Sequence, residues 1–164
     1  MVVYRPFMAV VVTGAAMGIG KAVALALANE GKAVVMVDRA AAPLNEAAAK
    51  VNASGGRAET VVGDVADPET AAASVKRAVG AFGKLDGLSH NAGIQRYGTA
   101  VSTPYETWNE VLAVNLSAAF YFARAALPEL VKTKGAVVMM ASVQGLATQR
   151  GVAAYTMPST GLSA

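Results

Sequence analysis

The sequence predicts an α/β protein of the Rossmann type, with a doubly wound parallel sheet in three layers and helices on both faces. Short apolar runs rich in valine alternate along the chain with longer alanine-rich stretches. Strands that are apolar throughout and separated by helices are typical of a parallel sheet covered on both faces. Right-handed crossovers then give the strand order 3-2-1-4-5. The chain contains no linker or internal repeat, so residues 1–164 are expected to form one domain.

The first third of the chain supplies two strand–helix units. Residues 7–13 form a short apolar run that ends at a glycine, which predicts a buried strand. A helix is expected over residues 18–30, because AVALALA gives it an apolar side and Gly31 follows it. The apolar run 32–38 predicts the second strand, and the alanine-rich segment 43–52 predicts the second helix.

The rest of the chain continues this alternation with a longer helical region. The expected strands are 57–63, 85–90 and 136–141, and the expected helices are 68–82 and 103–133. Asp67 is a suitable N-cap for the shorter of these helices, with Pro68 at its first position. The longer helix is expected to bend near Asn115 and again near Pro128.

Composition excludes several classes of protein. The chain has no cysteine and one histidine, so we expect no disulfide framework and no metal site. The net charge is +3, but the basic residues are scattered singly, and we therefore expect no nucleic-acid partner. No apolar run approaches the roughly 18 residues of a membrane span, and the first apolar stretch lacks a cleavage site. We expect no membrane association and a cytoplasmic location.

A glycine-rich segment follows the first predicted strand. Residues 13–20 have the sequence TGAAMGIG and lead into the first predicted helix. Glycines at such a turn let the backbone approach a pyrophosphate, whose charge is favoured by the helix N-terminus. The residues expected to bind a dinucleotide here are Gly14, Met17, Gly18, Ile19 and Gly20.

Asp38 ends the second predicted strand, eighteen residues after Gly20. A carboxylate at this place accepts hydrogen bonds from the hydroxyls of an adenosine ribose, and it repels a 2′-phosphate. The sequence therefore predicts NAD as the cofactor, with NADP less favoured. Arg39 leaves NADP open, because arginine can accommodate the 2′-phosphate. A glycine-rich turn beside a surface aspartate is the purely structural alternative.

The Gly-xxx-Gly-x-Gly spacing resembles that of the short-chain dehydrogenase/reductase family, whose TGxxxGIG motif is complete at residues 13–20. The resemblance covers residues 10–164. Asp64-Val65, after the third predicted strand, is similar to the pair that contacts adenine in this family. Asn91-Ala92-Gly93, after the fourth, is similar to the family's NAG motif, which stabilises the sheet and lines the cofactor cleft.

Three further residues resemble the catalytic residues of this family. Asn115 matches its active-site asparagine, and Ser142 and Tyr155, thirteen residues apart, match its serine and tyrosine. The resemblance implies an NAD-dependent oxidoreductase that interconverts an alcohol and a ketone or aldehyde by hydride transfer. Tyr155 would be the acid/base, Ser142 would hold the substrate oxygen, and Asn115 would position backbone and water. A phenol, with an ordinary pKa of about 10, needs that pKa lowered for this role.

The sequence departs from the family pattern four residues after Tyr155, where Ser159 replaces a lysine. In the family, that lysine would lower the tyrosine pKa and bind the nicotinamide ribose. Pro158 disfavours helical geometry at Met157, so we expect no unbroken helix from Tyr155 past Pro158. A catalytically inactive nucleotide-binding fragment or interaction module is therefore the alternative function.

Members of the family usually continue beyond the point at which this chain stops, so we expect the C-terminal part of the family fold to be absent. The long helix would then lose a neighbour, and one apolar stripe on it would be partly uncovered. That stripe consists of Leu112, Leu116, Phe120 and Ala123. The resemblance also implies a small-molecule alcohol or carbonyl substrate and a homodimer or homotetramer.

Two polar residues near the predicted cleft invite a functional interpretation. His90 could act as a proton shuttle, but it has no acid in sequence reach, so a packed or solvent-bonded histidine is favoured. Arg96 could hold an acidic substrate, and the role of a solvated loop residue is favoured over this one.

Overall fold

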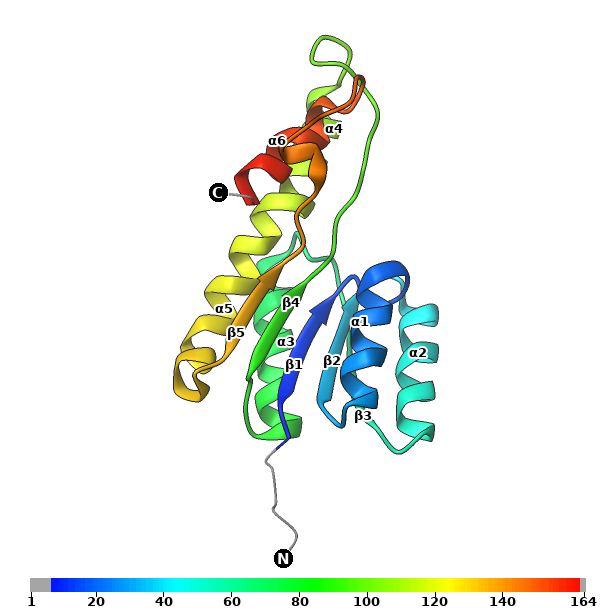
Figure 1. Ribbon diagram of the computed structural model, residues 1–164, viewed down its shortest axis with the longest axis vertical. Helices are drawn as coiled ribbons and strands as arrows, with labels where there is room; N and C mark the ends of the chain where they lie inside the picture. The colour runs from blue at the N-terminus through cyan, green and yellow to red at the C-terminus, as the bar shows by residue number, and fades with distance from the viewer. Residues whose placement is uncertain (1–6, 163–164) are drawn as a thin grey trace, which may run out of the picture.

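Residues 7–162, which the computed structural model describes, form a five-stranded parallel sheet with helices on both faces (Figure 1). The strand order is β3-β2-β1-β4-β5, as predicted. The strands are β1 (Ala9–Thr13), β2 (Ala33–Asp38), β3 (Arg57–Val62), β4 (Gly87–His90) and β5 (Ala136–Met139). The chain winds outward from β1 to β3 and then returns to the other side of β1. The carboxyl ends of β1 and β4 therefore lie side by side, where a doubly wound fold binds its ligands.

The helices lie close to their predicted positions. They are α1 (Gly18–Asn29), α2 (Ala41–Ala53), α3 (Pro68–Phe82), α4 (Tyr105–Leu112), α5 (Ala118–Thr133) and α6 (Ala153–Leu162), with a π-helical turn η1 (Ala113–Ser117) and a 3-10 turn η2 (Val143–Gly145). The predicted range of α3 is the observed one, because the Asp67 carboxylate accepts the Glu69 N–H at 2.9 Å and so caps the helix. Boundaries of the other predicted elements differ from the observed ones by two residues or fewer.

Successive side chains of each strand point to opposite faces of the sheet, and this divides the core into two halves. On β1, Val10 and Val12 point to the face covered by α1 and α2, whereas Val11 points to the face covered by α3 and α5. Met36 and Val35 on β2 divide in the same way. Because successive side chains of a strand point to opposite faces, a strand that is apolar throughout buries both faces, as the sequence indicated.

Helices α4 and α5 join through η1 into one helical region, Tyr105–Thr133. Its length and apolar composition would allow it to cross a membrane, and no other helix among residues 7–162 meets both conditions. Val114, Phe122 and Leu130 are buried in the core, which accounts for the apolar composition of one side. Of the two places where a bend was expected, Asn115 lies in the π-helical turn η1 and Pro128 lies inside α5, which continues past it.

One side of this helical region is uncovered, as the sequence predicted. Leu116 and Phe120 are 37% and 59% exposed, and Leu112 and Ala123 are only partly buried. Large apolar side chains on one helix face are typical of a surface that another chain or domain covers. The homodimer or homotetramer implied by the family resemblance would cover it, and that assembly stays a prediction.

The prediction that Pro158 interrupts the helix after Tyr155 is wrong. Helix α6 extends to Leu162 with Pro158 inside it. Proline removes one helical hydrogen bond and crowds the preceding turn, but tertiary packing can outweigh that cost. Pro158 is buried, and a Cβ on Gly145 of η2 would come within 2.7 Å of the Ser159 carbonyl oxygen. Close packing of α6 on η2 therefore supports the helix.

Candidate active site

A cleft of about 550 Å³ opens at the carboxyl ends of the central strands, beside the N-terminus of α1. Every residue predicted to bind the cofactor lines it: Gly14, Met17, Gly18, Ile19, Gly20, Asp38, Arg39, Asp64, Val65, Asn91, Ala92 and Gly93. These residues lie at or directly after the carboxyl ends of β1, β2, β3 and β4. The topology brings them together because parallel strands end at the same edge.

Two glycines shape the part of the cleft next to α1. A Cβ on Gly20 would come within 2.7 Å of the Thr13 carbonyl oxygen. Gly18 has φ +56°, a conformation that glycine adopts without strain. Met17 provides no side-chain cap for α1, so the amide groups of the first helical turn are available to an anion. This arrangement fits a pyrophosphate.

Two backbone amides hold the carboxylate of Asp38 at the end of β2. Its Oδ2 accepts the Ala16 N–H at 3.1 Å, and its Oδ1 accepts the Ala40 N–H at 3.0 Å. A carboxylate offers about four acceptor positions, so these bonds fix the group and leave capacity for two ribose hydroxyls. Arg39 lines the same cleft with an exposed side chain. The site therefore fits an adenosine ribose.

Thr13 links β1 to the segment that follows β4. Its Oγ1 accepts the N–H groups of Asn91 at 3.0 Å and Ala92 at 3.1 Å. Because both lone pairs are then used, the hydroxyl proton points to Nδ1 of His90, 3.1 Å away, which is therefore the unprotonated nitrogen. His90 is a packed histidine, as expected, and its Nε2 has no hydrogen-bond partner among the residues described. Burial lowers the pKa of His90 to about 4, so the ring is neutral at pH 7.

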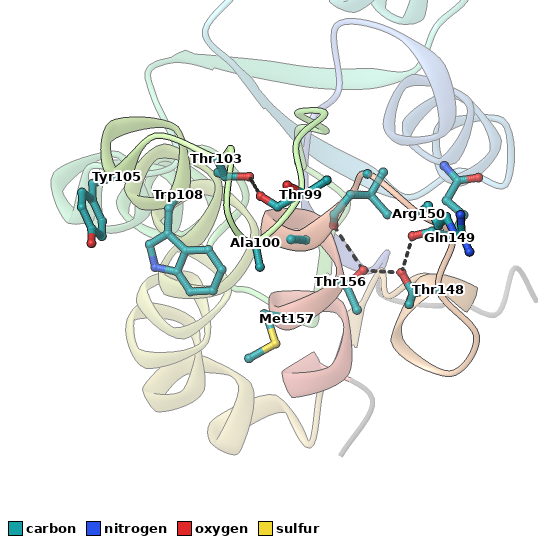
Figure 2. A pocket seen from close by; sticks show the side chains of 13 residues that line it. Thr99, Ala100, Thr103, Tyr105, Trp108, Thr148, Gln149, Arg150, Thr156 and Met157 are labelled. Carbon is teal, nitrogen blue, oxygen red and sulfur yellow. Dashed lines mark hydrogen bonds between the residues drawn. The ribbon is translucent and has the colours of Figure 1, made fainter.

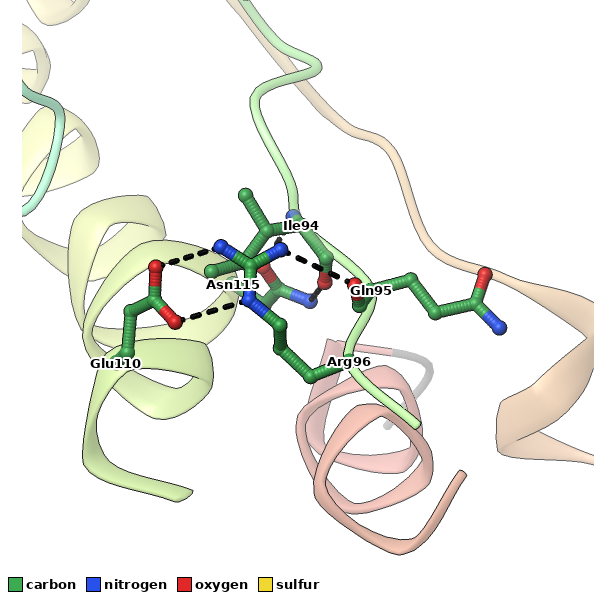
Figure 3. Close-up of polar contacts among 5 residues, drawn as sticks. All are labelled: Ile94, Gln95, Arg96, Glu110 and Asn115. Carbon is green, nitrogen blue, oxygen red and sulfur yellow. Dashed lines mark hydrogen bonds and ion pairs between the residues drawn. The ribbon is translucent and has the colours of Figure 1, made fainter. Parts of the chain in front are cut away.

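Asn115 holds the backbone of Ile94 from the π-helical turn η1 (Figure 3). Its Oδ1 accepts the Ile94 N–H, and its Nδ2 donates to the Ile94 carbonyl, both at 2.8 Å. The side chain is 7% exposed, and both ends of its amide are used in this contact. Asn115 thus fixes the chain at the point where Ile94 enters the cleft.

Ser142 and Tyr155 lie outside the cofactor cleft. The Oγ of Ser142 accepts the Gln144 N–H at 3.3 Å, at the start of η2. Tyr155 is in the first turn of α6 and is partly buried, and its hydroxyl has no hydrogen-bond partner within residues 7–162. The structure therefore brings the predicted cofactor residues together, whereas Ser142, Tyr155 and Asn115 do not line that cavity.

Ser159, at the position of the family lysine, is a buried part of α6. Its Oγ donates to the Tyr155 carbonyl oxygen at 2.8 Å, and the residue is 5% exposed. This bond attaches the hydroxyl to the helix backbone and not to the phenol. Lys132 and Lys134 precede β5, at the edge of the sheet opposite the cleft. None of these residues supplies a cation to the phenol.

A second cavity, of about 640 Å³, lies between the start of α4 and the start of α6 (Figure 2). Tyr105 and Trp108 from α4, Met157 from α6 and Arg150 from the preceding loop line it. None of the predicted cofactor or catalytic residues does. It is larger than the cofactor cleft, but it lacks the glycine-rich turn and the Asp38 carboxylate, so its size does not make it the cofactor site.

Some residues of the cleft were not predicted from the sequence. They are Ala40, Gly63, Ile94 and Val114. Gly63 follows β3 directly and Ile94 follows the Asn91-Ala92-Gly93 motif, so their place at strand ends could have indicated them. Val114 had no such signal, because its position depends on how the π-helical turn packs on the sheet.

Comparison with known proteins shows the family to which the chain belongs. The family model described as short chain dehydrogenase matches residues 8–160 of the chain. The chain is a member of the short chain dehydrogenase family. It therefore belongs to an oxidoreductase lineage.

Two curated relatives and one solved structure illustrate the similarity. The 2,5-dichloro-2,5-cyclohexadiene-1,4-diol dehydrogenase of Sphingobium indicum is 37% identical over 145 residues, which are 88% of this chain and 58% of that protein. The inactive 2-(S)-hydroxypropyl-CoM dehydrogenase 2 of Xanthobacter autotrophicus is 40% identical over 85 residues, which are 51% of this chain and 37% of that protein. The crystal structure of a short chain dehydrogenase from Mycobacterium smegmatis has a TM-score of 0.90 and 34% identity, covering 95% of this chain and 67% of that one. This chain spans less than two thirds of the length of both curated relatives.

Proposed function

We propose that the chain acts in an NAD-dependent oxidoreductase that interconverts an alcohol and a ketone or aldehyde. The observation that carries this proposal is the convergence of the glycine-rich turn, Asp38 and the Asn91-Ala92-Gly93 segment on one cleft. The turn fits a pyrophosphate, and the carboxylate fits a ribose. The relative from Sphingobium indicum, which is named as the dehydrogenase of a diol, supports the reaction class.

NAD is the favoured cofactor because of the charge and position of Asp38. Its carboxylate is held by the Ala16 and Ala40 amides, and it can accept the hydroxyls of an unmodified ribose. A 2′-phosphate would lie against this negative charge. Arg39 beside it is the one feature of the cleft that favours NADP.

The proposed chemistry divides between the cofactor and this chain. The residues of the cofactor cleft would hold the dinucleotide, and its nicotinamide group would supply the hydride donor or acceptor. Tyr155 gives or takes the proton at its phenol oxygen. Ser142 donates its hydroxyl proton to the substrate oxygen, since its Oγ already accepts from Gln144 and its own proton is free to donate. Asn115 keeps the Ile94 backbone in place beside the cleft.

Ser159 favours the alternative function, an inactive nucleotide-binding module. A serine at this position carries no charge, and its hydroxyl donates to the Tyr155 carbonyl, so it cannot supply the cation that the family lysine provides beside the phenol. Cofactor binding is common to both functions, and turnover separates them. Turnover is tested by following the absorbance of NADH in the presence of small ketones. A chain that binds NAD but does not oxidise NADH would support the inactive module.

Calorimetric titration of the chain with NAD and with NADP tests the proposed cofactor. We expect NAD to bind more tightly than NADP. Asp38→Asn should weaken NAD binding by about tenfold, because it replaces a charged acceptor by a neutral one, and it should not weaken NADP binding. Asp67→Asn is the matched control, since Asp67 caps α3 and does not line the cleft. Equal NAD affinity in the Asp38→Asn variant, or no binding by the parent chain, would contradict the proposal.

A further inference from the structure

Residues 94–98 connect the cofactor cleft to the helix that carries Tyr155, and we call them the strap. They form neither helix nor a named strand. At one end Ile94 lines the cleft and is held by Asn115. At the other end Gly98 contacts the start of α6. The strap is therefore a direct link between the cofactor site and the predicted acid/base.

The link to α6 consists of backbone hydrogen bonds. The Gly98 N–H donates to the Gly151 carbonyl at 2.7 Å, and the Ala153 N–H donates to the Gly98 carbonyl at 3.1 Å. Ala153 is the first residue of α6, two residues before Tyr155. Movement of the strap at Gly98 would therefore move the first turn of α6.

Arg96 fixes the strap between its two ends (Figure 3). Its Nε donates to Oε2 of Glu110 at 3.1 Å, and its Nη2 donates to Oε1 at 2.8 Å. Its Nη1 donates to the Gln95 carbonyl at 3.2 Å, which gives a backbone group of the strap a partner. A planar guanidinium makes these bonds together, and a lysine ammonium cannot reproduce the fork.

Glu110 and Asn115 both hold the strap from the same helical region. In a regular α-helix, residues five apart point about 140° away from each other. The π-helical turn at 113–117 has more residues per turn than an α-helix, which reduces this angle. The irregular turn thus allows Asn115 to hold Ile94 while Glu110 holds Arg96.

We propose that Arg96 and Glu110 are positioning residues that set the place of the Tyr155 helix relative to the cofactor cleft. The effect of this role on catalysis rests on the proposed function, in which Tyr155 is the acid/base. The two side chains are each 40% exposed, and an exposed ion pair adds little to global stability. Its bidentate geometry instead restricts a segment that has no sheet ladder of its own.

Amide exchange measured by NMR tests the strap without any requirement for activity. We expect the amides of Gly98 and Ala153 to exchange about tenfold faster in Arg96→Met, and similarly faster in Arg96→Lys, because loss of the fork frees the strap. Amides of the core, such as that of Val35, should not change. Arg77→Met is the matched control, since Arg77 forms an exposed ion pair with Glu59 away from the strap.

Two further measurements connect the strap to catalysis. The dissociation constant for NAD should stay within about twofold of the parent value in each Arg96 variant, because Arg96 and Glu110 do not line the cleft. In the chain or in any longer protein that contains it, kcat should fall while KM for the cofactor does not change.

Parent-like exchange at Gly98 and Ala153 in Arg96→Met, or in Arg96→Lys, would overturn the proposal. So would faster exchange throughout the domain, or an unchanged kcat in an active enzyme with faster exchange at these amides. Failure of the parent chain to bind NAD would instead overturn the proposed function, while the exchange rates would still decide whether Arg96 holds the strap.

Discussion

The cofactor cleft lies at the ends of well-packed strands, whereas Ser142 and Tyr155 follow β5, at the exposed edge of the sheet. The apolar residues of β1 and β2 are buried between two layers of helices. In β5 the first three residues are exposed, and Leu146 in the loop beyond it is 84% exposed. The part of the molecule that would bind a nucleotide is thus far more firmly packed than the part that would transfer a proton.

The polar groups of the two regions differ in the same way. Around the cleft, Asp38 and Thr13 each accept two backbone N–H groups, which fixes their oxygen atoms before any ligand arrives. In the segment after β5, the Oγ of Ser142 accepts one backbone N–H, that of Gln144, and the Tyr155 hydroxyl has no hydrogen-bond partner within the described part of the chain. Nucleotide binding should therefore depend on the first region and tolerate changes in the second.

Gly20→Ala should have the largest effect on the cleft. The new Cβ would overlap the backbone of Gly14 and Thr13, so α1 must shift away from the glycine-rich turn. We expect the affinity for NAD, measured by calorimetry, to fall by about 100-fold or more, since the helix N-terminus no longer meets the pyrophosphate.

Gly80→Ala is the matched control for that change. Gly80 lies inside α3, and a Cβ there would meet no atom within 4 Å. Alanine is the better helix former, so the melting temperature should rise slightly and NAD affinity should not change. Parent-like NAD binding by Gly20→Ala would mean that the turn is not the pyrophosphate site, and the contrast between the two regions would lose its basis.

Lowering the pH should reduce the folding stability of the chain through His90, which is buried beside the cleft. Burial lowers its pKa in the folded state to about 4, whereas the unfolded chain takes up the proton near the ordinary value of 6.5. The unfolded state therefore gains protons first as pH falls, and folding stability declines between pH 6.5 and 4. We expect a loss of roughly 2 kcal/mol between pH 7 and pH 5, measured by urea unfolding.

His90→Gln separates this effect from other titrations. The chain has no other histidine, so in the variant the free energy of unfolding should change much less between pH 7 and pH 5. Glutamine can still accept the Thr13 hydroxyl proton, which keeps the link between β1 and the Asn91-Ala92-Gly93 segment. An unchanged slope would show that His90 is solvated and that this side of the cleft is less firmly packed than the structure indicates.

Features that depend on short stretches of sequence could be predicted, and those that depend on packing between distant segments could not. The valine runs, the Asp67 cap and the glycine-rich turn act within one element and its neighbour, so the sheet order and the glycine-rich part of the cleft followed from them. Asp64-Val65 and Asn91-Ala92-Gly93 were expected from the family resemblance. The unbroken helix through Pro158 depends on η2, and the bond between Arg96 and Glu110 joins residues fourteen apart. No local pattern contains such contacts.

Ser159→Lys changes the segment that carries Ser142 and Tyr155, and we expect it to have the smallest effect on NAD binding. A lysine ammonium that reaches the cleft could bind the nicotinamide ribose, and a charged hydrogen bond of this kind corresponds to about tenfold tighter NAD binding. Met157→Lys is the control, because Met157 is exposed on α6 and lines the other cavity. If both variants bind NAD like the parent, position 159 does not face the nicotinamide end of the cleft, and the difference between the two regions is one of geometry as well as charge.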